Sequence, residues 1–416
     1  MGAKHIKIKN KKKFIISTTF LVLILISIFV GFFLLLDNYL FKAQQTASDI
    51  TADSSNHTSS QDFVSSENIP QDTSVTLAVI GDIMCHNTQY KDAYQANTGT
   101  YNFSYVFSEL KDKLASTDLT IGNLETTFAG NGRAYSSYPT FNTPEALATS
   151  LKDIGIDILS TANNHSLDTG FNGLSNTLNV LDNLGIKHMG TYRTEEEQNS
   201  ILVHEINGIK FAFLSYTYGT NGIPIPSGKD FCVNLISEDL ILRQIEQAKS
   251  ENVDVICVSM HWGTEYLDVP NKEQERLADF LFENGVDIIL GSHPHVLEKM
   301  EKRTVTTKDG KTKDGFVIYS LGNFVSGQVK KNTRSSIILN MTVTKKADGN
   351  ISIDSIDYTP IYCYTASKSK GYKLIDIAHE LELYEAQSSN YINSSNATFY
   401  KNELERIHQV LGWIQE

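Results

Sequence analysis

Beyond about residue 75, short apolar runs alternate with longer amphipathic stretches. Seven apolar runs, rich in β-branched residues and mostly bounded by glycine, predict strands: VTLAVIG from Val75, DLTIG from Asp118, IDILSTA from Ile156, KFAFLSY from Lys210, VDVICVSM from Val253, VDIILG from Val286 and FVIYSLG from Phe316. Four amphipathic stretches predict helices: PEALATSLKDIG from Pro144, FNGLSNTLNVLDNLG from Phe171, SEDLILRQIEQAKSENV from Ser237 and NKEQERLADFLFENG from Asn271. This alternation predicts an α/β layered domain with a central mixed, largely parallel sheet or sheets.

The C-terminal part of the chain has a different pattern. Two apolar runs, 335–343 and 351–356, have no helical stretch between them, so they predict a hairpin or a mixed edge of the sheet. The last fifty residues are polar, and LIDIAHELELYEAQ and FYKNELERIHQVLGWI are the expected helices. We therefore expect a folded domain at 75–364 and a helical C-terminal extension at 365–416.

The N-terminal region predicts a membrane anchor. Residues 14–36 contain no charged side chain, and as a helix they would be about 34 Å long, enough to cross the hydrocarbon core. Residues 1–13 carry six lysines, and the positive-inside rule places such a segment in the cytoplasm and the remainder outside the cell. A cleaved signal peptide is the alternative, but the apolar run is longer than a usual signal core and no small-residue cleavage pattern follows at once. The polar residues 37–74 predict a flexible linker.

Charge and cysteine content narrow the class of protein. The formal net charge of −12 combines +6 in the first thirteen residues with −18 in the rest. An acidic body argues against nucleic-acid binding, which needs a basic surface to displace counterions. Cys85, Cys232, Cys257 and Cys363 are widely spaced and form no CxxC pair, so they do not indicate a metal site. Cys257 lies inside an apolar run, which predicts a core residue.

Ligand-type polar residues follow one apolar run after another. Because the carboxyl ends of parallel strands meet at one edge of an open α/β sheet, these residues should lie together. Six strands end in this way, and the residues are Asp82, Asn123, Glu125, Asn163, Asn164, His165, His261, His293, His295 and Asn323. The sequence therefore predicts one site of carboxylate, amide and imidazole groups.

The donor chemistry of this edge favours a divalent metal ion. Imidazole, carboxylate and amide oxygen together suit a borderline ion, and Mn, Zn or Fe are the expected identities. Such an ion acts as a Lewis acid and lowers the pKa of bound water. His293 and His295 are the most specific candidate ligand pair. Pro294 between them stiffens the turn, so both imidazoles can point to the same place. The expected metal ligands are Asp82, Asn123, Glu125, Asn164, His261, His293 and His295.

Other residues have expected roles in catalysis and substrate binding. His165 and His261 are the catalytic candidates, which would stabilise developing charge or pass a proton. For His261 a purely structural role, as a buried imidazole held only by hydrogen bonds, is an equal alternative. Asn323 is a candidate substrate ligand. The alternative role for this residue is to cap the segment that follows it. Arg133 and Arg193 are loop residues that would meet an anionic substrate.

Six blocks of the sequence resemble those of a known family. They are GDIM at Gly81, GNLE at Gly122, ANNH at Ala162, HWGTEY at His261, GSHPHV at Gly291 and SLGNF at Ser320. In this order they look like the CapA or PgsA family of capsule and poly-γ-glutamate synthesis proteins, whose domain would span about 75–364 here. The resemblance implies a role in making or exporting a capsule-type polymer and a fold related to calcineurin-like metallophosphatases.

The match to the metallophosphatase pattern is incomplete at its first blocks. In that superfamily an Asp-x-His block precedes a second Asp, an Asn-His pair, a lone His and a His-x-His pair. The matching positions here are Asp82, Asn123 or Glu125, Asn164 with His165, His261, and His293 with His295. Met84 stands where the first histidine would be, and an Asn or Glu replaces the second Asp. One metal position is therefore in doubt, and only a turn that bends back would bring His86 into it.

Three functions fit these observations. As the resemblance implies, the chain would be a capsule-synthesis accessory that binds an anionic cell-surface polymer and contacts integral-membrane synthase subunits through its anchor. The second function is a metal-dependent hydrolase of a phosphoester or amide in a cell-envelope polymer, which the His-Pro-His pair favours and the missing Asp-x-His block disfavours. The third is a non-catalytic anion-binding module. Because the body is acidic, an anionic polymer also requires local positive charge, from a metal or from Arg133 and Arg193.

Overall fold

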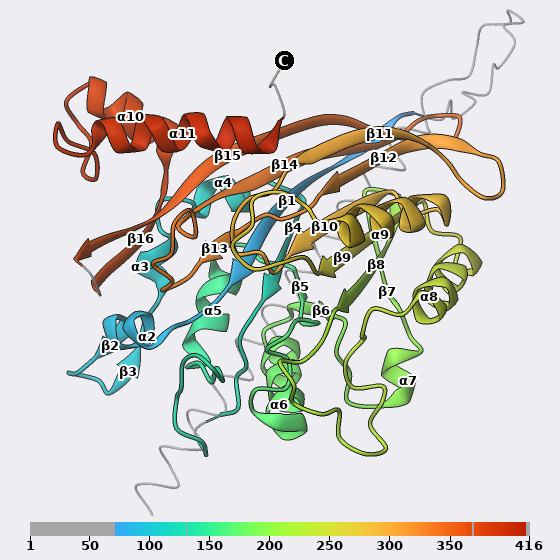
Figure 1. Cartoon of the computed structure of the whole chain (residues 1–416), viewed down its shortest axis with the longest axis horizontal. Helices are drawn as coiled ribbons and strands as arrows, with labels where there is room; N and C mark the ends of the chain where they lie inside the picture. The colour runs from blue at the N-terminus through green and yellow to red at the C-terminus, as the bar shows by residue number, and fades with distance from the viewer. Residues whose placement is uncertain (1–70, 131, 368–369, 413–416) are drawn as a thin grey trace, which may run out of the picture. The chain divides into compact units, whose positions relative to one another are not determined.

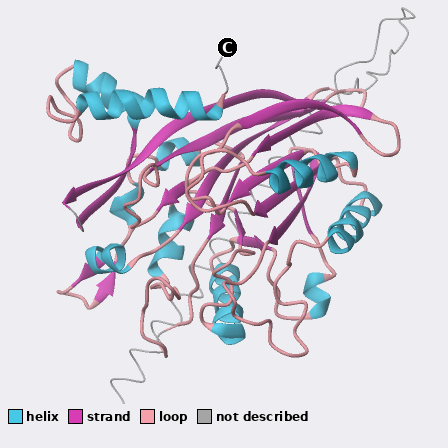
Figure 2. Ribbon diagram, in the orientation of Figure 1, coloured by secondary structure: helices cyan, strands magenta, loops and turns pink. Residues whose placement is uncertain are grey.

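The computed structural model describes residues 71–130, 132–367 and 370–412. The predicted cytoplasmic segment 1–13, the predicted anchor 14–36 and nearly all of the predicted linker lie outside the described residues. In the described part of the chain, no helix has both the length and the apolar character needed to span a bilayer. That part forms two β-sheets that pack face to face, with helices on the outer faces (Figure 1 and Figure 2).

The first sheet has eight strands in the order β16-β15-β14-β1-β4-β5-β6, and β13 pairs with the C-terminal end of β1. β1, β4, β5 and β6 are parallel neighbours, whereas β14, β15 and β16 run antiparallel to their neighbours. The bounds are β1 Thr73–Ile83, β4 Leu119–Leu124, β5 Ile158–Ser160, β6 Lys187–Met189, β13 Asn323–Val325, β14 Ser335–Lys345, β15 Ile351–Ser367 and β16 Lys370–Asp376.

The second sheet has six strands in the order β11-β12-β10-β9-β8-β7. Its four central strands are parallel, and β7 and β11 close the two edges in antiparallel pairing. The bounds are β7 Leu202–Ile206, β8 Ile209–Thr217, β9 Val255–His261, β10 Ile288–Ser292, β11 Met300–Thr306 and β12 Thr312–Ile318. A separate short hairpin joins β2 Tyr94–Gln95 to β3 Thr100–Tyr101.

Helices cover the sheets on several sides. Side chains of α3, α4 and α5 belong to the hydrophobic cluster on the outer face of the eight-stranded sheet, and those of α8 and α9 to the cluster on the other sheet. α10 and α11 add side chains to the core that the two sheets share. The bounds are α2 Asn87–Ala93, α3 Ser104–Phe107, α4 Lys111–Ala115, α5 Ala146–Asp153, α6 Gly170–Asn183, α7 Glu195–Gln198, α8 Glu238–Ser250, α9 Lys272–Glu283, α10 Ile377–Glu385 and α11 Ala397–Leu411.

Side chains that point alternately to the two faces of a strand contribute to two hydrophobic layers. Along β1, Val75 and Leu77 belong to the core between the sheets, whereas Ala78 and Ile80 belong to the cluster under α3 to α5. Successive side chains of a strand point to opposite faces, so a strand buried on both faces is apolar at nearly every position. Cys257 is fully buried in the core between the sheets, as predicted.

The predicted mixed α/β architecture with parallel strands is confirmed. Each of the seven predicted strands and four predicted helices coincides with an observed element to within a few residues. The runs 335–343 and 351–356 lie in β14 and β15, which pair antiparallel as a sheet edge. The sequence pattern missed several short strands, among them β6, β7 and β11.

The range 365–416 is not wholly helical, because β16 precedes the two helices. In β16, Tyr372 and Leu374 join one hydrophobic cluster and Ile375 joins another, which is the two-residue period of a strand. The prediction began the helix at Leu374 and so overlooked this alternation. The helix begins only at Ile377, where the side chain of Asp376 accepts a hydrogen bond from a backbone N–H of the first turn.

Glu298 is a buried carboxyl group outside the predicted site. Its Oε2 accepts a 2.6 Å hydrogen bond from Gln274 Nε2, and its Oε1 has no hydrogen-bond partner in the described part of the chain. Burial raises the pKa of Glu298 to about 8. The folded state therefore binds this proton more tightly than the unfolded state does.

We expect Glu298→Gln to stabilise the protein in a pH-dependent way. The folded wild type loses stability as the pH rises from the ordinary carboxyl pKa of 4.5 to about 8, and the amide removes this loss. The thermal midpoints of the two proteins should be close at pH 4.5 and differ by several degrees at pH 8. A difference in midpoint that stays constant over this pH range would contradict the prediction.

Candidate functional site

The polar strand ends predicted from the sequence come together at one edge of the two sheets. Strand register places Asp82 on β1 beside Asn123 on β4 and beside Asn323 on β13. In the other sheet, His261 at the end of β9 lies beside Ser292 at the end of β10. Asn123 Nδ2 donates to Asp82 Oδ1 at 2.8 Å and lies 3.5 Å from His261 Nδ1, so this amide links the two sheets. Parallel pairing thus gathers the residues as expected.

A close backbone approach sets the position of Asp82. The Asp82 N–H donates to the Gly322 carbonyl at 2.9 Å. A Cβ atom on Gly81 would lie only 1.9 Å from the same carbonyl oxygen, so a residue with a side chain does not fit there. The glycines of the GDIM and SLGNF blocks therefore allow these two segments to touch.

Glu125 carries a carboxyl oxygen that no described residue hydrogen-bonds. The residue is fully buried, and its Oε1 has no hydrogen-bond partner among the described residues. This oxygen lies 3.8 Å from Nε2 of His261 and 3.8 Å from Nε2 of His295. Burial, followed by the charge of Asp82, holds the pKa of Glu125 well above its usual range. Such a group is costly unless a proton or a cation lies beside it, so the residues present fit a divalent metal ion.

The His-Pro-His turn has an unusual backbone conformation. The φ angle is 97° at His293 and 60° at His295, in a region that is strained for residues with side chains. The His293 N–H donates to Asp82 Oδ2 at 3.4 Å, and His295 Nδ1 lies 3.1 Å from the same oxygen. His293 Nδ1 is buried with no hydrogen-bond partner in the described part of the chain. The turn thus brings the backbone of His293 and the ring of His295 to one carboxylate.

Two groups of donor atoms are close enough to hold a cation. One consists of Asp82, Glu125 and His261, and the other of Glu265, His293 and His295; within each group the ligand atoms lie within 4.8 Å of one another. Five of these six residues were predicted as ligands. The exposed Glu265 was missed, although it lies in the HWGTEY block just after β9.

The two asparagines predicted as ligands contact the histidine side of the site. Asn164 Oδ1 lies 3.0 Å from His261 Nε2, and Ser292 Oγ lies 2.9 Å from His261 Nδ1, so both ring nitrogens of His261 have polar neighbours. Asn123 is held by Asp82 and by Asn163, whose Nδ2 donates to Asn123 Oδ1 at 3.3 Å. These amides orient the carboxylate and imidazole groups around them.

His165 forms a pair with the carboxylate of Asp168, which was not predicted from the sequence. Its Nδ1 lies 2.7 Å from Asp168 Oδ2, and both residues are buried. Asp168 Oδ2 also accepts a 2.6 Å hydrogen bond from the Phe141 N–H, which fixes the carboxylate. His165 Nε2 lies 3.4 Å from Asn221 Nδ2. The i,i+3 spacing of the two residues in ANNHSLD was the available signal.

His86 lies beside the site but belongs to neither donor group. Its Nδ1 accepts a 3.2 Å hydrogen bond from the Gly327 N–H, and its ring lies 5.1 Å from the Phe141 ring, edge to face. Burial lowers the pKa of His86 to about 4, so its imidazole is neutral at pH 7. Met84, at the position where the superfamily pattern has histidine, is buried with its Sδ 3.8 Å from Ser326 Oγ.

The predicted substrate ligands do not share one surface. Asn323 lies in the site, where its Oδ1 is 3.1 Å from His295 Nδ1 and its Nδ2 donates to Gln328 Oε1 at 2.9 Å. The exposed Arg133 donates to the Thr169 carbonyl at 3.2 Å, one residue beyond Asp168. Asn323 therefore holds a histidine in place, and Arg133 borders the loop that carries His165.

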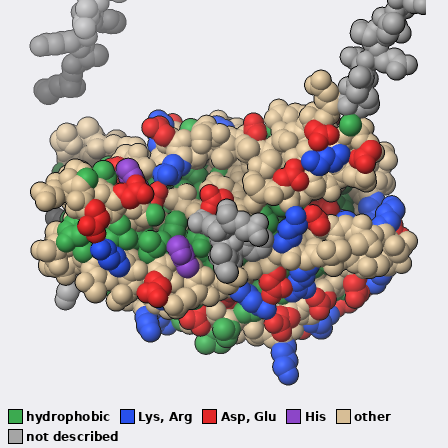
Figure 3. All heavy atoms as spheres, turned by 90° about the horizontal axis from the view of Figure 1, so that it is seen from above, with side chains coloured by type: hydrophobic (Ala, Val, Ile, Leu, Met, Phe, Trp, Pro, Cys, Tyr) green, Lys and Arg blue, Asp and Glu red, His purple; other side chains and the backbone are tan. Residues whose placement is uncertain are grey.

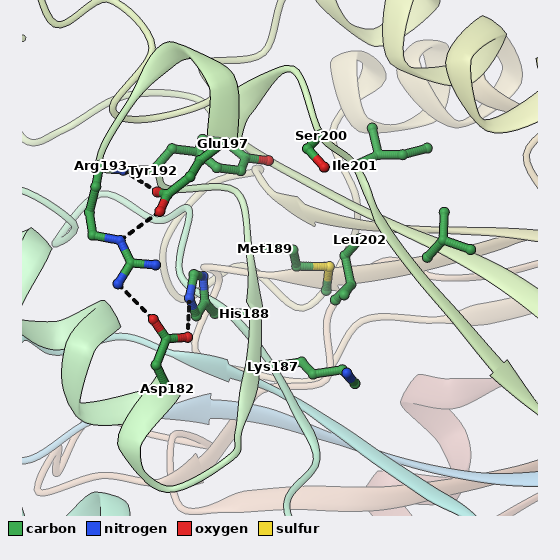
Figure 4. Close-up of a pocket in the computed structure, with 11 residues that line it drawn as sticks. Asp182, Lys187, His188, Met189, Tyr192, Arg193, Glu197, Ser200, Ile201 and Leu202 are labelled. Carbon is green, nitrogen blue, oxygen red and sulfur yellow. Dashed lines mark hydrogen bonds and ion pairs between the residues drawn. The ribbon is translucent and has the colours of Figure 1, made fainter. Parts of the chain in front are cut away.

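Arg193 is not one of the residues that the fold brings to this edge. It lines a pocket of about 350 Å³ together with residues of β6 and β7 (Figure 4). Its guanidinium forms ion pairs with Asp182 at 2.6 Å and Glu197 at 2.8 Å, and His188 Nε2 lies 3.1 Å from Asp182. Two carboxylates already neutralise this arginine, a tertiary arrangement that the loop sequence alone does not reveal.

Comparison with known proteins identifies the family of the chain. Residues 76–328 match the family described as bacterial capsule synthesis protein PGA_cap. The chain belongs to this family. The matched range of the PGA_cap family contains every residue of the site described above, from Asp82 to Asn323.

Two curated relatives have moderate sequence identity to this PGA_cap family member. The capsule biosynthesis protein CapA of Bacillus anthracis is 28% identical over 272 residues, which cover 64% of this chain and 63% of that protein. The PGA biosynthesis protein CapA of Bacillus subtilis (strain 168) is 29% identical over 297 residues, which cover 69% of this chain and 72% of that protein. The match thus spans slightly less than two thirds of the Bacillus anthracis protein.

Solved structures show a weaker likeness. The NAD nucleotidase of Haemophilus influenzae has a TM-score of 0.44 and 13% identity, covering 81% of this chain and 63% of that chain. The calcineurin-like phosphoesterase YfkN of Bacillus subtilis has a TM-score of 0.41 and 14% identity, covering 81% of this chain and 97% of that chain. Both TM-scores are below 0.5.

We expect Glu125→Gln to raise stability and to weaken metal binding. Without metal, the amide removes a buried carboxylate beside Asp82, so the thermal midpoint should rise by several degrees at pH 7 in the presence of a chelator. With metal, the loss of the carboxylate should lower the affinity for divalent ions by at least about tenfold. Calorimetry and elemental analysis measure the two effects.

Glu298→Gln is the matched control for this experiment. It also replaces a buried carboxyl with a raised pKa, but the residue belongs to neither donor group. It should raise the thermal midpoint and leave metal binding unchanged. Equal metal affinity in the Glu125→Gln protein and the wild type would show that Glu125 is not a ligand.

Proposed function

We propose that this chain takes part in the synthesis or export of a capsule-type polymer, poly-γ-glutamate, at the outer face of the cell membrane. The observation that carries the proposal is the match of residues 76–328 to the capsule synthesis family, because that range contains the whole buried site. The similar Bacillus proteins are named for capsule biosynthesis and PGA biosynthesis.

The site supports binding of an anionic chain through a divalent metal ion. Asp82, Glu125 and His261, together with His293 and His295, are the residues that would hold the ion, and Mn, Zn or Fe suit this donor set. When bound, the ion supplies positive charge for an anionic ligand and Lewis acidity toward water or a carbonyl. The protein beyond residue 13 carries a formal charge of −18, so such a ligand needs local positive charge to approach.

A metal-dependent hydrolase is the second candidate, acting on a phosphoester or amide bond of a cell-envelope polymer. The observation that favours it is the buried pair of His165 and Asp168, with Nδ1 of the histidine 2.7 Å from the carboxylate. The carboxylate fixes the tautomer and orientation of the ring, so that Nε2 is the nitrogen available to exchange a proton. A polymer-binding protein without turnover would not need this arrangement.

We further propose that residues 14–36 form a single transmembrane helix, with residues 1–13 in the cytoplasm and the folded domain outside the cell. The charge-free run and the preceding lysines support this topology. The polar residues 37–74 would link the anchor to β1. Integral-membrane subunits of the polymer synthase are the proposed partners of the anchor.

We expect His293→Ala and His295→Ala each to weaken both metal binding and polymer binding. The wild type should bind divalent metal and poly-γ-glutamate, and each variant should lose at least about tenfold in metal affinity. His204→Ala is the matched control, because His204 lies on β7 outside both donor groups. Elemental analysis and equilibrium binding to poly-γ-glutamate are the measurements.

Turnover distinguishes the two candidate functions. Hydrolysis of γ-glutamyl chains or a phosphodiester by the wild type, lost in His165→Ala with metal retained, would support the hydrolase. Metal and polymer binding without turnover would support the accessory role. A metal-loaded wild type that binds no poly-γ-glutamate and cleaves none would contradict the proposed function.

The topology can be tested by labelling of introduced cysteines. The four native cysteines are all buried and unpaired, so they give little background with a membrane-impermeant maleimide. We expect Ser65→Cys to be labelled on intact cells and Asn10→Cys only after lysis. Labelling of both positions only after lysis would overturn the outward orientation of the domain.

A further inference from the structure

A basic pocket lies next to the candidate site. It has a volume of about 400 Å³ and lies between the loop that follows β13 and the helix α11. Lys330, Lys331 and Arg334 of the loop form one part of its lining, and Tyr362 of β15 and Phe399 of α11 form another. None of these residues belongs to the donor groups described above.

Gln328 connects the basic loop to the candidate site. Its Oε1 accepts a 2.9 Å hydrogen bond from Asn323 Nδ2, and Asn323 Oδ1 lies 3.1 Å from His295 Nδ1. The Gln328 carbonyl accepts a 3.4 Å hydrogen bond from Arg334 Nε. One residue therefore contacts both the amide that holds His295 and an arginine of the pocket.

A second contact joins the loop to the site through Tyr266. The Lys330 Nζ lies 3.5 Å from the centroid of the Tyr266 ring, a cation–π contact. The Tyr266 ring lies 5.9 Å from the ring of His295. The pocket and the candidate site therefore adjoin each other, and a chain of a few repeating units can reach from one to the other.

Within the described part of the chain, the basic side chains of the pocket are not neutralised by ion pairs. Lys330, Lys331 and Arg334 form none with the described carboxylates, and Arg334 instead donates to Thr365 Oγ1 at 2.9 Å. Glu403, the acidic residue of the pocket lining, is paired with Arg406 at 3.0 Å and accepts a hydrogen bond from Ser335 Oγ. Other arginines do form ion pairs with carboxylates, namely Arg193, Arg276, Arg303 and Arg406.

The pocket also has exposed apolar surface. Val329 is 77% exposed and Phe399 is 45% exposed, and the Phe399 ring packs edge to face against Tyr362 at 5.6 Å. On the side of the molecule where α10 and α11 lie, Figure 3 shows apolar side chains exposed among acidic and basic ones. A ligand that combines negative charge with short aliphatic segments matches this lining.

We propose that this pocket is a second subsite for an extended polycarboxylate chain that also occupies the candidate metal site. Carboxylates of the chain pair with Lys330, Lys331 and the planar guanidinium of Arg334, while its methylene groups pack on Val329 and Phe399. Two connected subsites increase the affinity for a long chain over a short one through effective concentration. The proposal rests on the proposed function, and it adds a feature that makes the protein prefer long polymer chains over short ones.

The test compares two double variants of the full chain with the same change in net charge. Lys330→Gln/Lys331→Gln removes the loop cations, and Lys308→Gln/Lys311→Gln removes two lysines from another pocket. The control pair is matched, because Lys308 also lies over an aromatic ring, 5.4 Å from the Phe280 centroid. The ligands are long poly-γ-glutamate, the γ-glutamyl dimer and, as a polyanion of different chemistry, polyphosphate.

We expect the loop variant to bind long poly-γ-glutamate about tenfold more weakly than the wild type. Its metal content and its affinity for the dimer should be unchanged, and the control variant should bind the long chain as the wild type does. Arg334→Gln should weaken binding of the long chain in the same direction.

Three results would overturn the subsite. The first is long-chain binding that is unchanged in the loop variant, which leaves the proposed function intact because the wild type still binds polymer. The second is equal weakening in both double variants, which reflects net charge alone. The third is a loop-dependent affinity for polyphosphate with none for poly-γ-glutamate. A wild type that binds neither the dimer nor the long chain would count against the proposed function itself.

Discussion

The site is arranged around two carboxylates, Asp82 and Glu125, that are fully buried where the two sheets meet. Burial of ionised groups costs several kcal/mol unless other groups compensate. The carboxylate of Asp82 is stabilised by contacts with the Asn123 amide, the His293 N–H and the His295 ring. Glu125 has an oxygen with no such partner in the described structure. A fold that keeps this group gives up stability at one edge, which is characteristic of a site selected for binding or chemistry.

The scaffold and the loops have separate tasks. The shared core of the two sheets fixes the strand ends, and therefore the positions of Asp82 and His261. Loops then supply the variable parts: the segment after β5 carries the His165 pair, the segment after β9 carries Glu265 and Tyr266, and the loop after β13 carries Lys330 and Lys331. Rigid strands with functional loops are a common division of labour in α/β proteins. Here it places a metal-type site and a basic pocket side by side.

The sequence predicted the residues that depend on strand ends, because their position follows from parallel pairing alone. Asp82, Asn123 and His261 were found in this way. Residues that act through loop geometry were harder to find: Asp168 reaches His165 only because the segment after β5 turns, and the residues of the basic loop after β13 were not among those predicted. Arg193 was misplaced because its partners come from a separate helix, α6, and from α7. The strand β16 was predicted as part of a helix. Its apolar side chains alternate every two residues over only a short stretch, and the helical pattern of apolar residues in α10 follows at once.

The cysteines have a consequence for where the domain can fold. All four are buried and unpaired, and burial raises the pKa of the Cys85 thiol to about 12 and that of Cys363 to about 11. Protonated, inaccessible thiols react slowly with oxidants and with other thiols. The sandwich therefore depends on packing and strand pairing without any covalent cross-link. It is expected to reach the same fold in a reducing or an oxidising compartment.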